Sequence, residues 1–355
     1  MTDVIHASRN NPVRVALAGL GRVGTVHAHN ILNALPQAEL VRIQDADEEV
    51  ARARSAELCG IPWSLDFAEI VADPAIEAIL IATPSTLHLE HIRIAAQAGK
   101  HIFVEKPIAL TRADTFEAIE IARANGVRLQ VGFQLRFEPT FIEARQAIDN
   151  GDVGQIYQVR ITHRDYKPRD IAFTLTSGGL YADVTVHDFD LARFLAGEIA
   201  EVTAFGDALS PGFADSGDID NGIVVVRFTN GAFGVIDNTR VGGYGFDFFA
   251  EILGSRSTVR AVLPLRKSGI EVLTDARSTT QNVTRGVQSY NRAYIGELKS
   301  FLEDVVRGGR QPESSSLDAA AAFVLAEAAE ISRRERRTVK LDHTAASDGT
   351  VYDIR

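Results

Sequence analysis

The segment VRVALAGLGRVGTVHAHNILNAL, residues 13–35, decides the fold of this chain. Its first part, 13–20, is mostly apolar and contains β-branched valines, which predicts a buried strand. Residues 23–35 are predicted to form a helix. Three glycines occupy the turn between the two elements. A strand that leads through a glycine-rich turn into a helix is typical of parallel α/β sheets that bind nucleotides.

The same alternation continues through the first 130 residues. The predicted strands are 13–20, 39–47, 75–84, 101–107 and 127–133, and the predicted helices are 23–35, 48–58, 87–99 and 111–126. Alternation of this kind predicts a doubly wound parallel sheet. We therefore expect a first domain over residues 1–132, with a flexible tail at 1–11.

The pattern changes after residue 133. A helix (139–151), a half-buried strand (156–165) and a helix (177–195) are followed by strand-like segments at 201–209, 222–231, 232–241, 246–255 and 258–265. Two helices, 291–309 and 318–335, close the chain. This order predicts an α+β second domain over 133–355, with one broad, open and mostly antiparallel sheet.

Composition limits the class of protein. A chain of 355 residues suggests two domains, and 45% hydrophobic with 24% charged residues is typical of a soluble protein. No run reaches the roughly 18 apolar residues of a membrane span, and residues 1–11 lack a signal-peptide core. A net charge of −10 argues against nucleic acid as a partner, and the lone Cys59 fits a cytoplasmic location.

The glycine turn predicts a dinucleotide site. Gly19, Gly21 and Gly24 match G-x-G-x-x-G, in which the glycines permit the turn, the approach of a pyrophosphate and helix packing. Asp45 follows 21 residues after Gly24, where a carboxylate can accept hydrogen bonds from the ribose hydroxyls. A carboxylate there repels a 2′-phosphate, which favours NAD over NADP. Arg22 could instead steady either the pyrophosphate or a phosphorylated ribose.

A second feature is Glu105-Lys106-Pro107 at the end of a predicted strand. Proline restricts the preceding residue to extended geometry, so Lys106 is aimed at the carboxyl edge of the sheet, where ligands bind. A lysine there can hydrogen-bond a substrate hydroxyl or take part in proton transfer. A surface lysine before a loop is the alternative.

A third feature lies in SGGLYADVTVHDFDLARF, residues 177–194. Asp183, His187 and Asp190 are spaced i, i+4 and i+7, so a regular helix places them in one narrow arc. Apolar residues lie beside this arc, whereas a helix face exposed to solvent would normally carry polar residues there. The pattern predicts that the three side chains point into the protein. The alternative is an acidic helix start with a packed core histidine.

Together these segments resemble a known family. ATPSTLHLEHIRIAAQAGKHIFVEKP, with GLGRVG before it and SGGLYADVTVHDFDLARFL after it, is similar to the Gfo/Idh/MocA oxidoreductases over residues 13 to 340. VTVHDFDLARFLAG and VIDNTRVGGYGFDFFAEILGS most resemble the bacterial inositol 2-dehydrogenases in that family. The resemblance implies a Rossmann domain and an α+β domain whose open sheet face forms a homotetramer.

The resemblance also implies roles for individual residues. The catalytic set is Lys106, Asp183 and His187. The cofactor-binding set is Gly19, Gly21, Arg22, Val23, Gly24, Asp45, Thr83, Pro84, His88, Glu105 and Lys106. The substrate-binding set is Lys106, Arg136, His163, Asp183, His187, Asp190 and Tyr244. No metal is expected, although His27, His29, His88 and His91 are potential ligands.

The function expected from the resemblance is NAD-dependent oxidation of a secondary hydroxyl of myo- or scyllo-inositol. His187 is the natural base because an unperturbed imidazole has a pKa near neutrality, and Asp183 could stabilise the imidazolium. An aldose or pyranose dehydrogenase, and a cofactor-binding member without turnover, are the alternatives. Leu135-Arg136, where inositol enzymes often have two arginines, and the charged segment 165–176 leave the exact polyol open.

Overall fold

The computed structural model describes residues 11–167, 174, 177–214, 216–273, 278–284, 290–346 and 349–355. It forms two compact units. Unit 1 comprises Met1–Phe137, Arg292–Ala320 and Ala346–Gly349, and unit 2 comprises Glu138–Asn291, Ala321–Ala345 and Thr350–Arg355. Each helix in the described part of the chain is too short or too polar to span a bilayer.

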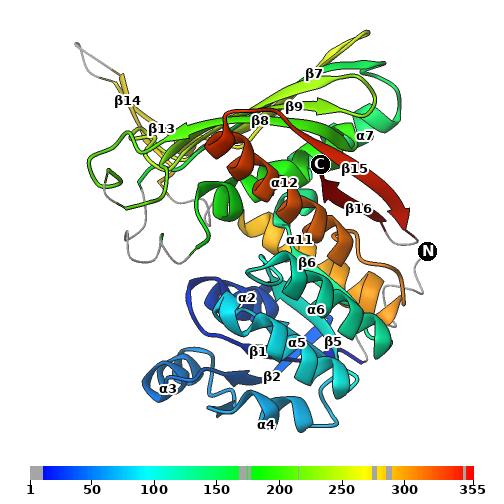
Figure 1. Ribbon diagram of the computed structural model, residues 1–355. Coiled ribbons are helices and arrows are strands. Elements are labelled where there is room, and N and C mark those ends of the chain that lie inside the picture. The colour runs from blue at the N-terminus through cyan, green and yellow to red at the C-terminus, as the bar shows by residue number, and fades with distance from the viewer. Residues whose placement is uncertain are drawn as a thin grey trace. The chain divides into compact units, whose positions relative to one another are not determined.

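Unit 1 contains a six-stranded parallel sheet in the order β3-β2-β1-β4-β5-β6 (Figure 1), which confirms the predicted doubly wound sheet. Its strands are β1 (Val13–Ala18), β2 (Ala38–Gln44), β3 (Trp63–Ser64), β4 (Ala78–Ile81), β5 (His101–Glu105) and β6 (Leu129–Gly132). Its helices are α2 (Arg22–Ala34), α3 (Glu48–Glu57), α4 (Phe67–Ala72), η2 (Ser85–Leu87), α5 (His88–Gln97), α6 (Arg112–Ala124), η3 (Gln134–Phe137), α11 (Asn291–Ser300) and η5 (Phe301–Arg307).

The core of unit 1 includes a segment from far along the chain. Leu17 of β1, Ile31 of α2 and Phe103 of β5 share one buried cluster with Leu298 and Phe301 from the end of α11 and the start of η5. The sequence prediction placed this helical segment in the second domain, with a single boundary at residues 132 and 133. Its packing instead places it in unit 1, because its apolar side chains are buried with the Rossmann sheet.

Unit 2 contains an eight-stranded sheet in the order β12-β11-β7-β10-β9-β8-β15-β16 and a two-stranded sheet, β13-β14. The large sheet is mixed: β7 and β10 are parallel, whereas β11–β7, β10–β9 and β8–β9 are antiparallel. Its strands are β7 (Ile156–Arg164), β8 (Ile199–Asp207), β9 (Asn221–Phe228), β10 (Phe233–Thr239), β11 (Asp247–Gly254), β12 (Thr258–Val262), β15 (Val339–Ala346) and β16 (Gly349–Ile354); the small sheet has β13 (Arg266–Leu273) and β14 (Ser278–Asn282).

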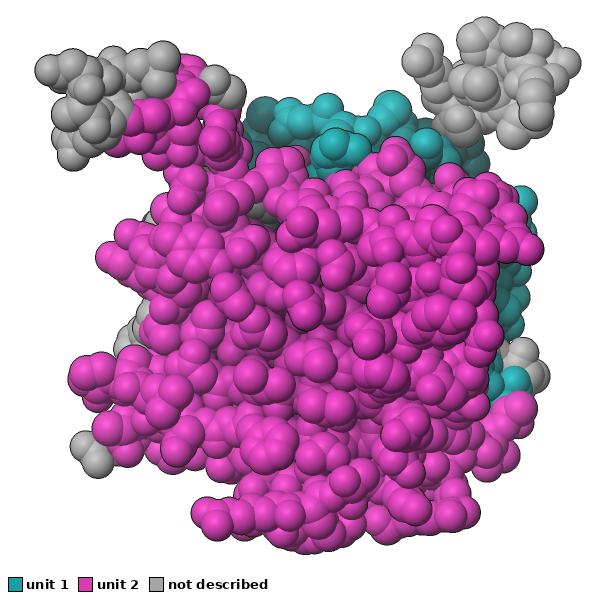
Figure 2. Space-filling view, turned by 90° about the horizontal axis from the view of Figure 1, so that it is seen from above, with its two compact units in different colours: residues 1–137, 292–320, 346–349 teal, residues 138–291, 321–345, 350–355 magenta. Residues whose placement is uncertain are grey.

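Helices cover one face of the large sheet. Helix α7 (Pro139–Asp149) packs on β12, α9 (Val186–Ala196) packs on β7, and α12 (Ser316–Glu335) reaches β8, where Ser332 Oγ accepts a hydrogen bond from the Ala204 amide. On the other face, every second residue of β9 is exposed. Figure 2 looks onto unit 2 from this side. The strands alternate because one sheet face is buried and the other is not.

The predicted helix 177–195 is not regular. Residues Tyr181–Thr185 form a π-helical turn, η4, that continues into α9. A π turn changes the angular spacing of side chains, so the i, i+4 geometry drawn from a regular helix does not apply to Asp183. Irregular turns of this kind occur frequently at functional sites.

Candidate active site

The glycine turn of unit 1 has the geometry of an anion site. Gly19 has φ +88°, and a Cβ on Gly24 would lie 1.9 Å from the Gly19 carbonyl oxygen, so both positions require glycine. Apart from its two chain neighbours, none of the residues that the structure describes has an atom within 4 Å of a Cβ built on Gly21, which leaves open space beside the turn. Helix α2 starts next to this space at Arg22, with no acidic residue in its first turn. A phosphate group fits such a helix start.

Asp45, just after β2, is tied to the same turn. Its Oδ2 accepts a hydrogen bond from the Leu20 amide at 2.8 Å, and its Oδ1 accepts one from the Asp47 amide at 3.1 Å. The carboxylate is therefore held beside the glycine turn, in the position expected for a group that binds ribose hydroxyls.

Two further turns at the carboxyl edge of this sheet are joined by His88. The ring is buried, with Nδ1 2.7 Å from the Pro107 carbonyl oxygen and Nε2 2.9 Å from the Thr83 carbonyl oxygen. Burial lowers the pKa of His88, and these two carbonyl contacts oppose that shift. His88 thus fixes the backbone after β4 to the backbone after β5.

His91 lies beside these turns. It stacks on Phe67 with ring centroids 3.9 Å apart, and its Nδ1 is 3.1 Å from Thr83 Oγ1. Burial, followed by the nearby His88, lowers the pKa of His91 to about 4, so the ring is neutral near pH 7. Pro84, the next residue of this turn, is exposed.

Lys106 is half-buried and follows the last residue of β5, Glu105. The Lys106–Pro107 peptide bond is cis. Glu105 Oε1 lies 2.6 Å from His27 Nε2. The four histidines considered as metal ligands therefore have separate partners: His27 contacts Glu105, the exposed His29 contacts Glu57, and His88 and His91 contact the turns described above.

In unit 2, Asp183 belongs to a buried ion-pair group. Arg240, directly after β10, donates from Nη1 to Asp183 Oδ2 at 3.0 Å, and its Nη2 lies 3.6 Å from Asp218 Oδ2. The side chains of Arg240, Asp183 and Asp218 are only 5%, 15% and 10% exposed. The arginine fixes the direction of the Asp183 carboxylate and compensates its charge.

His187 and Asp190 follow on α9, and both are buried. His187 and Asp190 avoid solvent as predicted, whereas Asp183, in the π turn outside the regular helix, is only partly buried. Asp190 has no exposed surface at all.

His163 of β7 is held by residues that the sequence did not single out. Its Nδ1 lies 3.1 Å from Asp188 Oδ1, and Asn238 of β10 donates to Asp188 Oδ2 at 2.7 Å. Thr185 donates to Asn238 Oδ1 at 2.7 Å, which links this chain of contacts to η4. The partner of His163 is therefore Asp188, next to His187, and the contact is buried on both sides.

Two predicted substrate contacts have strong partners inside their own units. Arg136 Nη1 donates to the Glu313 carbonyl oxygen at 2.9 Å, and its guanidinium pairs with both carboxylate oxygens of Asp318. Tyr244 is exposed and donates to Asp247 Oδ2 at 2.6 Å. Burial, followed by this carboxylate, raises the pKa of Tyr244. Part of the charged segment 165–176 lies outside the described residues.

The sequence did not identify four residues that hold these groups: Asp188, Asn238, Arg240 and Asp318. Asp188 lies inside the motif 177–194, but the spacing of residues in a helix does not predict that it contacts a functional side chain. The others are single polar residues in strands, loops or helices far away in the sequence. Their partners are set by tertiary packing, so no local pattern could reveal them.

Two family models match the chain. A family described as "Oxidoreductase family, NAD-binding Rossmann fold" matches residues 13–133, and the "GFO/IDH/MocA C-terminal domain" matches residues 141–260. The two matches cover the strands that carry the glycine turn and the strands that carry His163 and Asn238.

Individual relatives match over nearly the whole chain. The myo-inositol 2-dehydrogenase of Thermotoga maritima is 36% identical over 334 residues, which are 93% of this chain and 99% of the relative. The scyllo-inositol 2-dehydrogenase (NAD(+)) of Bacillus subtilis is 35% identical and aligns over 95% and 98% of the two chains. A crystal structure of a putative myo-inositol dehydrogenase from Sinorhizobium meliloti superposes with a TM-score of 0.88 at 35% identity, covering 92% of this chain and 99% of that one.

Proposed function

Because the chain belongs to the Gfo/Idh/MocA oxidoreductase family, we propose that it oxidises a secondary hydroxyl of myo- or scyllo-inositol to the ketone, with NAD as the hydride acceptor. The observation that carries this proposal is the similarity to named inositol 2-dehydrogenases over more than nine-tenths of the chain. An aldose or pyranose dehydrogenase, and a member without turnover, have no comparable support.

The residues of the glycine turn fit NAD. The open space at Gly21 and the start of α2 suit the pyrophosphate, and we assign Gly19, Gly21, Arg22, Val23 and Gly24 to it. Asp45 would accept hydrogen bonds from the adenosine ribose. When bound, the cofactor supplies a hydride acceptor. Thr83, Pro84, Glu105 and Lys106 would bind its nicotinamide end, because they lie in or beside the turns at the carboxyl edge of the sheet, and the buried His88 would hold two of these turns in place.

We assign catalysis to Lys106, Asp183 and His187. His187 would take the hydroxyl proton, because an imidazole is the side chain best matched to proton transfer near neutral pH. Asp183, held by Arg240, would bind the substrate and stabilise the charged imidazole. Lys106 would donate a hydrogen bond to the reacting oxygen and stabilise its developing negative charge.

The other substrate contacts are proposals of different strength. His163, oriented by Asp188, stays a candidate substrate contact from the family resemblance. Arg136, Asp190 and Tyr244 stay candidates from the family resemblance. The bidentate pairing of Arg136 with Asp318 and the full burial of Asp190 equally support structural roles.

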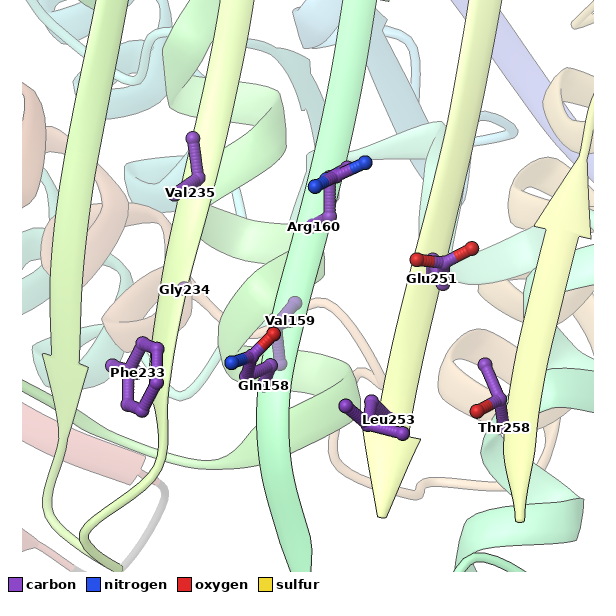
Figure 3. Close-up of a pocket in the computed structure, with 9 residues that line it drawn as sticks. All are labelled: Gln158, Val159, Arg160, Phe233, Gly234, Val235, Glu251, Leu253 and Thr258. Atoms are coloured by element: carbon purple, nitrogen blue, oxygen red, sulfur yellow. The ribbon is translucent and has the colours of Figure 1, made fainter.

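We further propose that the uncovered face of the large sheet joins copies of this chain, as a homotetramer requires. Exposed apolar side chains continue across β8, β9, β10, β11 and β12: Phe205, Ile223, Val225, Phe233, Val235, Leu253 and Val262. A depression of about 260 Å³ lies among them (Figure 3), where Arg160 and Glu251 are opposite each other on β7 and β11. Apolar patches of this kind mark protein interfaces.

The sheet face can be tested directly. Val225 and Val235 are cross-strand neighbours on β9 and β10, so Val225→Glu with Val235→Glu places two charges in the centre of the patch. Light scattering is expected to show tetramers for the unchanged protein and smaller species for the double variant. A monomeric unchanged protein would contradict the proposal.

The reaction is tested by following absorbance at 340 nm with NAD across a panel of inositol epimers and aldoses. We expect myo- or scyllo-inositol to give the highest kcat/KM, and NAD to be preferred to NADP. A higher kcat/KM with an aldose would favour a sugar dehydrogenase, and no reduction of NAD with any compound would favour a member without turnover.

A cytoplasmic location is also proposed, because Cys59 is an exposed free thiol.

A further inference from the structure

Three ionisable side chains from distant parts of the sequence meet inside unit 1. They are His27 of α2, Glu105 at the end of β5 and Glu297 of α11, and their ligand atoms lie within 4.8 Å of one another. His27 and Glu297 have no exposed surface, and the Glu105 side chain is 15% exposed. His27 packs edge-on against Phe103 and Tyr294, so the surroundings are largely apolar. The proposed mechanism uses neither His27 nor Glu297.

Glu297 is the unusual member of this cluster. Neither of its carboxylate oxygens has a hydrogen-bond partner among the residues that the structure describes. Its backbone is fixed, because Gln130 of β6 donates to the Glu297 carbonyl oxygen at 3.0 Å. Burial, followed by the negative charge of Glu105, raises the pKa of Glu297 well above its usual value of 4.5. This shift favours the protonated, neutral form of the side chain.

The cluster is connected to Lys106 through the backbone. Glu105 immediately precedes Lys106, and Gly132 makes room for its carboxylate, since an added Cβ would lie 3.1 Å from Glu105 Oε2. On the other side of Lys106, the Pro107 carbonyl oxygen contacts His88, whose pKa also responds to the charge of Glu105. Both neighbours of Lys106 are thus held by buried side chains.

We propose that His27 and Glu297, which are buried beside Glu105, are positioning residues that fix Glu105 and thereby the direction of Lys106. The link to catalysis rests on the proposed role of Lys106. A divalent cation is the competing occupant, because a histidine and two carboxylates can be metal ligands. The geometry favours a hydrogen bond between His27 and Glu105 over a bound metal ion. Their atoms Nε2 and Oε1 are 2.6 Å apart, a hydrogen-bond distance, whereas two ligands of one zinc ion lie roughly 3 Å or more apart.

Two substitutions of Glu297 test whether its polar atoms are needed to position Glu105. Glu297→Gln keeps the shape and the neutrality of the protonated acid, whereas Glu297→Leu removes both polar atoms. Glu303→Gln is the matched control, because Glu303 lies in the continuing helical segment and is 41% exposed. His27→Asn removes the contact with Glu105 and serves as a second variant if Glu297→Leu does not fold.

The first measurement needs no turnover. The chain has six lysines, so ¹³C-methylation gives few signals, and Lys106 is assigned with Lys106→Arg. We expect the Lys106 signal and its titration midpoint to be unchanged in Glu297→Gln and Glu303→Gln. In Glu297→Leu and His27→Asn we expect the midpoint to move by about half a pH unit or more, as a changed contact would cause. The proposal is overturned if the Lys106 signal and its titration midpoint in Glu297→Leu and in His27→Asn are the same as in the unchanged protein.

The second measurement is turnover against pH. Glu297→Gln should keep kcat within about twofold, whereas Glu297→Leu or His27→Asn should lower kcat about tenfold with little change in KM for NAD, as a displaced catalytic group would. Glu297→Gln should also extend activity to higher pH, because the glutamine cannot ionise. Damage by Gln equal to that by Leu, or one bound metal per chain lost in Glu297→Gln, would overturn the proposal. If the unchanged protein oxidises no polyol, the proposed function fails while the lysine signal still tests the positioning.

Discussion

Asp183 in unit 2 and Glu297 in unit 1 are both carboxyl groups withdrawn from water, and their neighbours differ. Arg240 lies 3.0 Å from Asp183, so that carboxylate can stay ionised. Glu297 lies near the negative charge of Glu105, and its pKa is raised by burial and by that charge. Burial removes the solvation of an ion, so a buried acid either acquires a cation or keeps its proton. Asp183 is thus paired with a cation, whereas the surroundings of Glu297 favour its neutral form.

The largest difference between the two regions should appear when the cation is removed. Arg240→Met leaves Asp183 and Asp218 without the buried guanidinium and is expected to lower the free energy of unfolding by about 3–5 kcal/mol. Urea unfolding at pH 7 measures this. Arg227→Met is the control, because Arg227 is 58% exposed in its pair with Glu201 and should change stability by less than about 1 kcal/mol. Equal effects of the two variants would show that the buried pair has no special weight.

The next effect concerns activity in the same region. His187→Ala is expected to lower kcat at least about a hundredfold, or about 2.7 kcal/mol, because the proton acceptor is lost. The Arg240 ion pairs do not involve His187, so the fold should persist, and the Kd of NAD from calorimetry should stay near normal. Unchanged turnover would remove His187 from the mechanism.

For Glu297 in unit 1 we expect a substitution that removes the carboxyl group to raise stability, whereas Arg240→Met in unit 2 lowers it. The pKa of Glu297 is raised in the folded state, so its contribution to stability is complete below its usual pKa of 4.5 and is lost as the pH rises through the raised value. In that window the loss is up to about 1.4 kcal/mol per pH unit. Glu297→Gln should therefore gain in Tm over the unchanged protein between pH 5 and 8, and Glu303→Gln shows the effect of losing an exposed carboxylate. A lower Tm for Glu297→Gln at pH 8 would mean that the ionised acid stabilises the fold.

The smallest expected effect concerns His91, whose pKa is lowered by burial, whereas burial raises the pKa of Glu297. The pKa of His91 is lowered from 6.5 to about 4 by burial and by His88, so its contribution to stability is present above pH 6.5 and is lost as the pH falls towards 4. The ring is only partly buried, so the loss should be smaller than about 1.4 kcal/mol per pH unit. His91→Gln should show a shallower decline of Tm between pH 6.5 and 4. Parallel curves would contradict the shift.

Much of the fold could be predicted because it depends on local patterns. The glycine turn, the alternation of strands and helices, and the alternating burial of β9 are all properties of short segments. Strand β7 was predicted to be half-buried, but Ile161, Thr162 and His163 are all buried, so its burial does not alternate there. The prediction was less successful where an element depends on distant partners. Strand β3 has two residues, β15 pairs with β8 from far along the chain, and η4 departs from a regular helix.

The sequence alone indicated the groups on which the proposed chemistry depends: a dinucleotide turn, a lysine at a strand end, and an aspartate and a histidine in one motif, since each is recognised from residues close together in the chain. Only the tertiary structure decided how those groups are held. Arg240 reaches Asp183 across 57 residues, Asp188 holds His163 across 25, and α11 brings Glu297 to Glu105. Charge and burial act through space, so whether a carboxyl group keeps its charge or its proton depends on neighbours that no local pattern specifies.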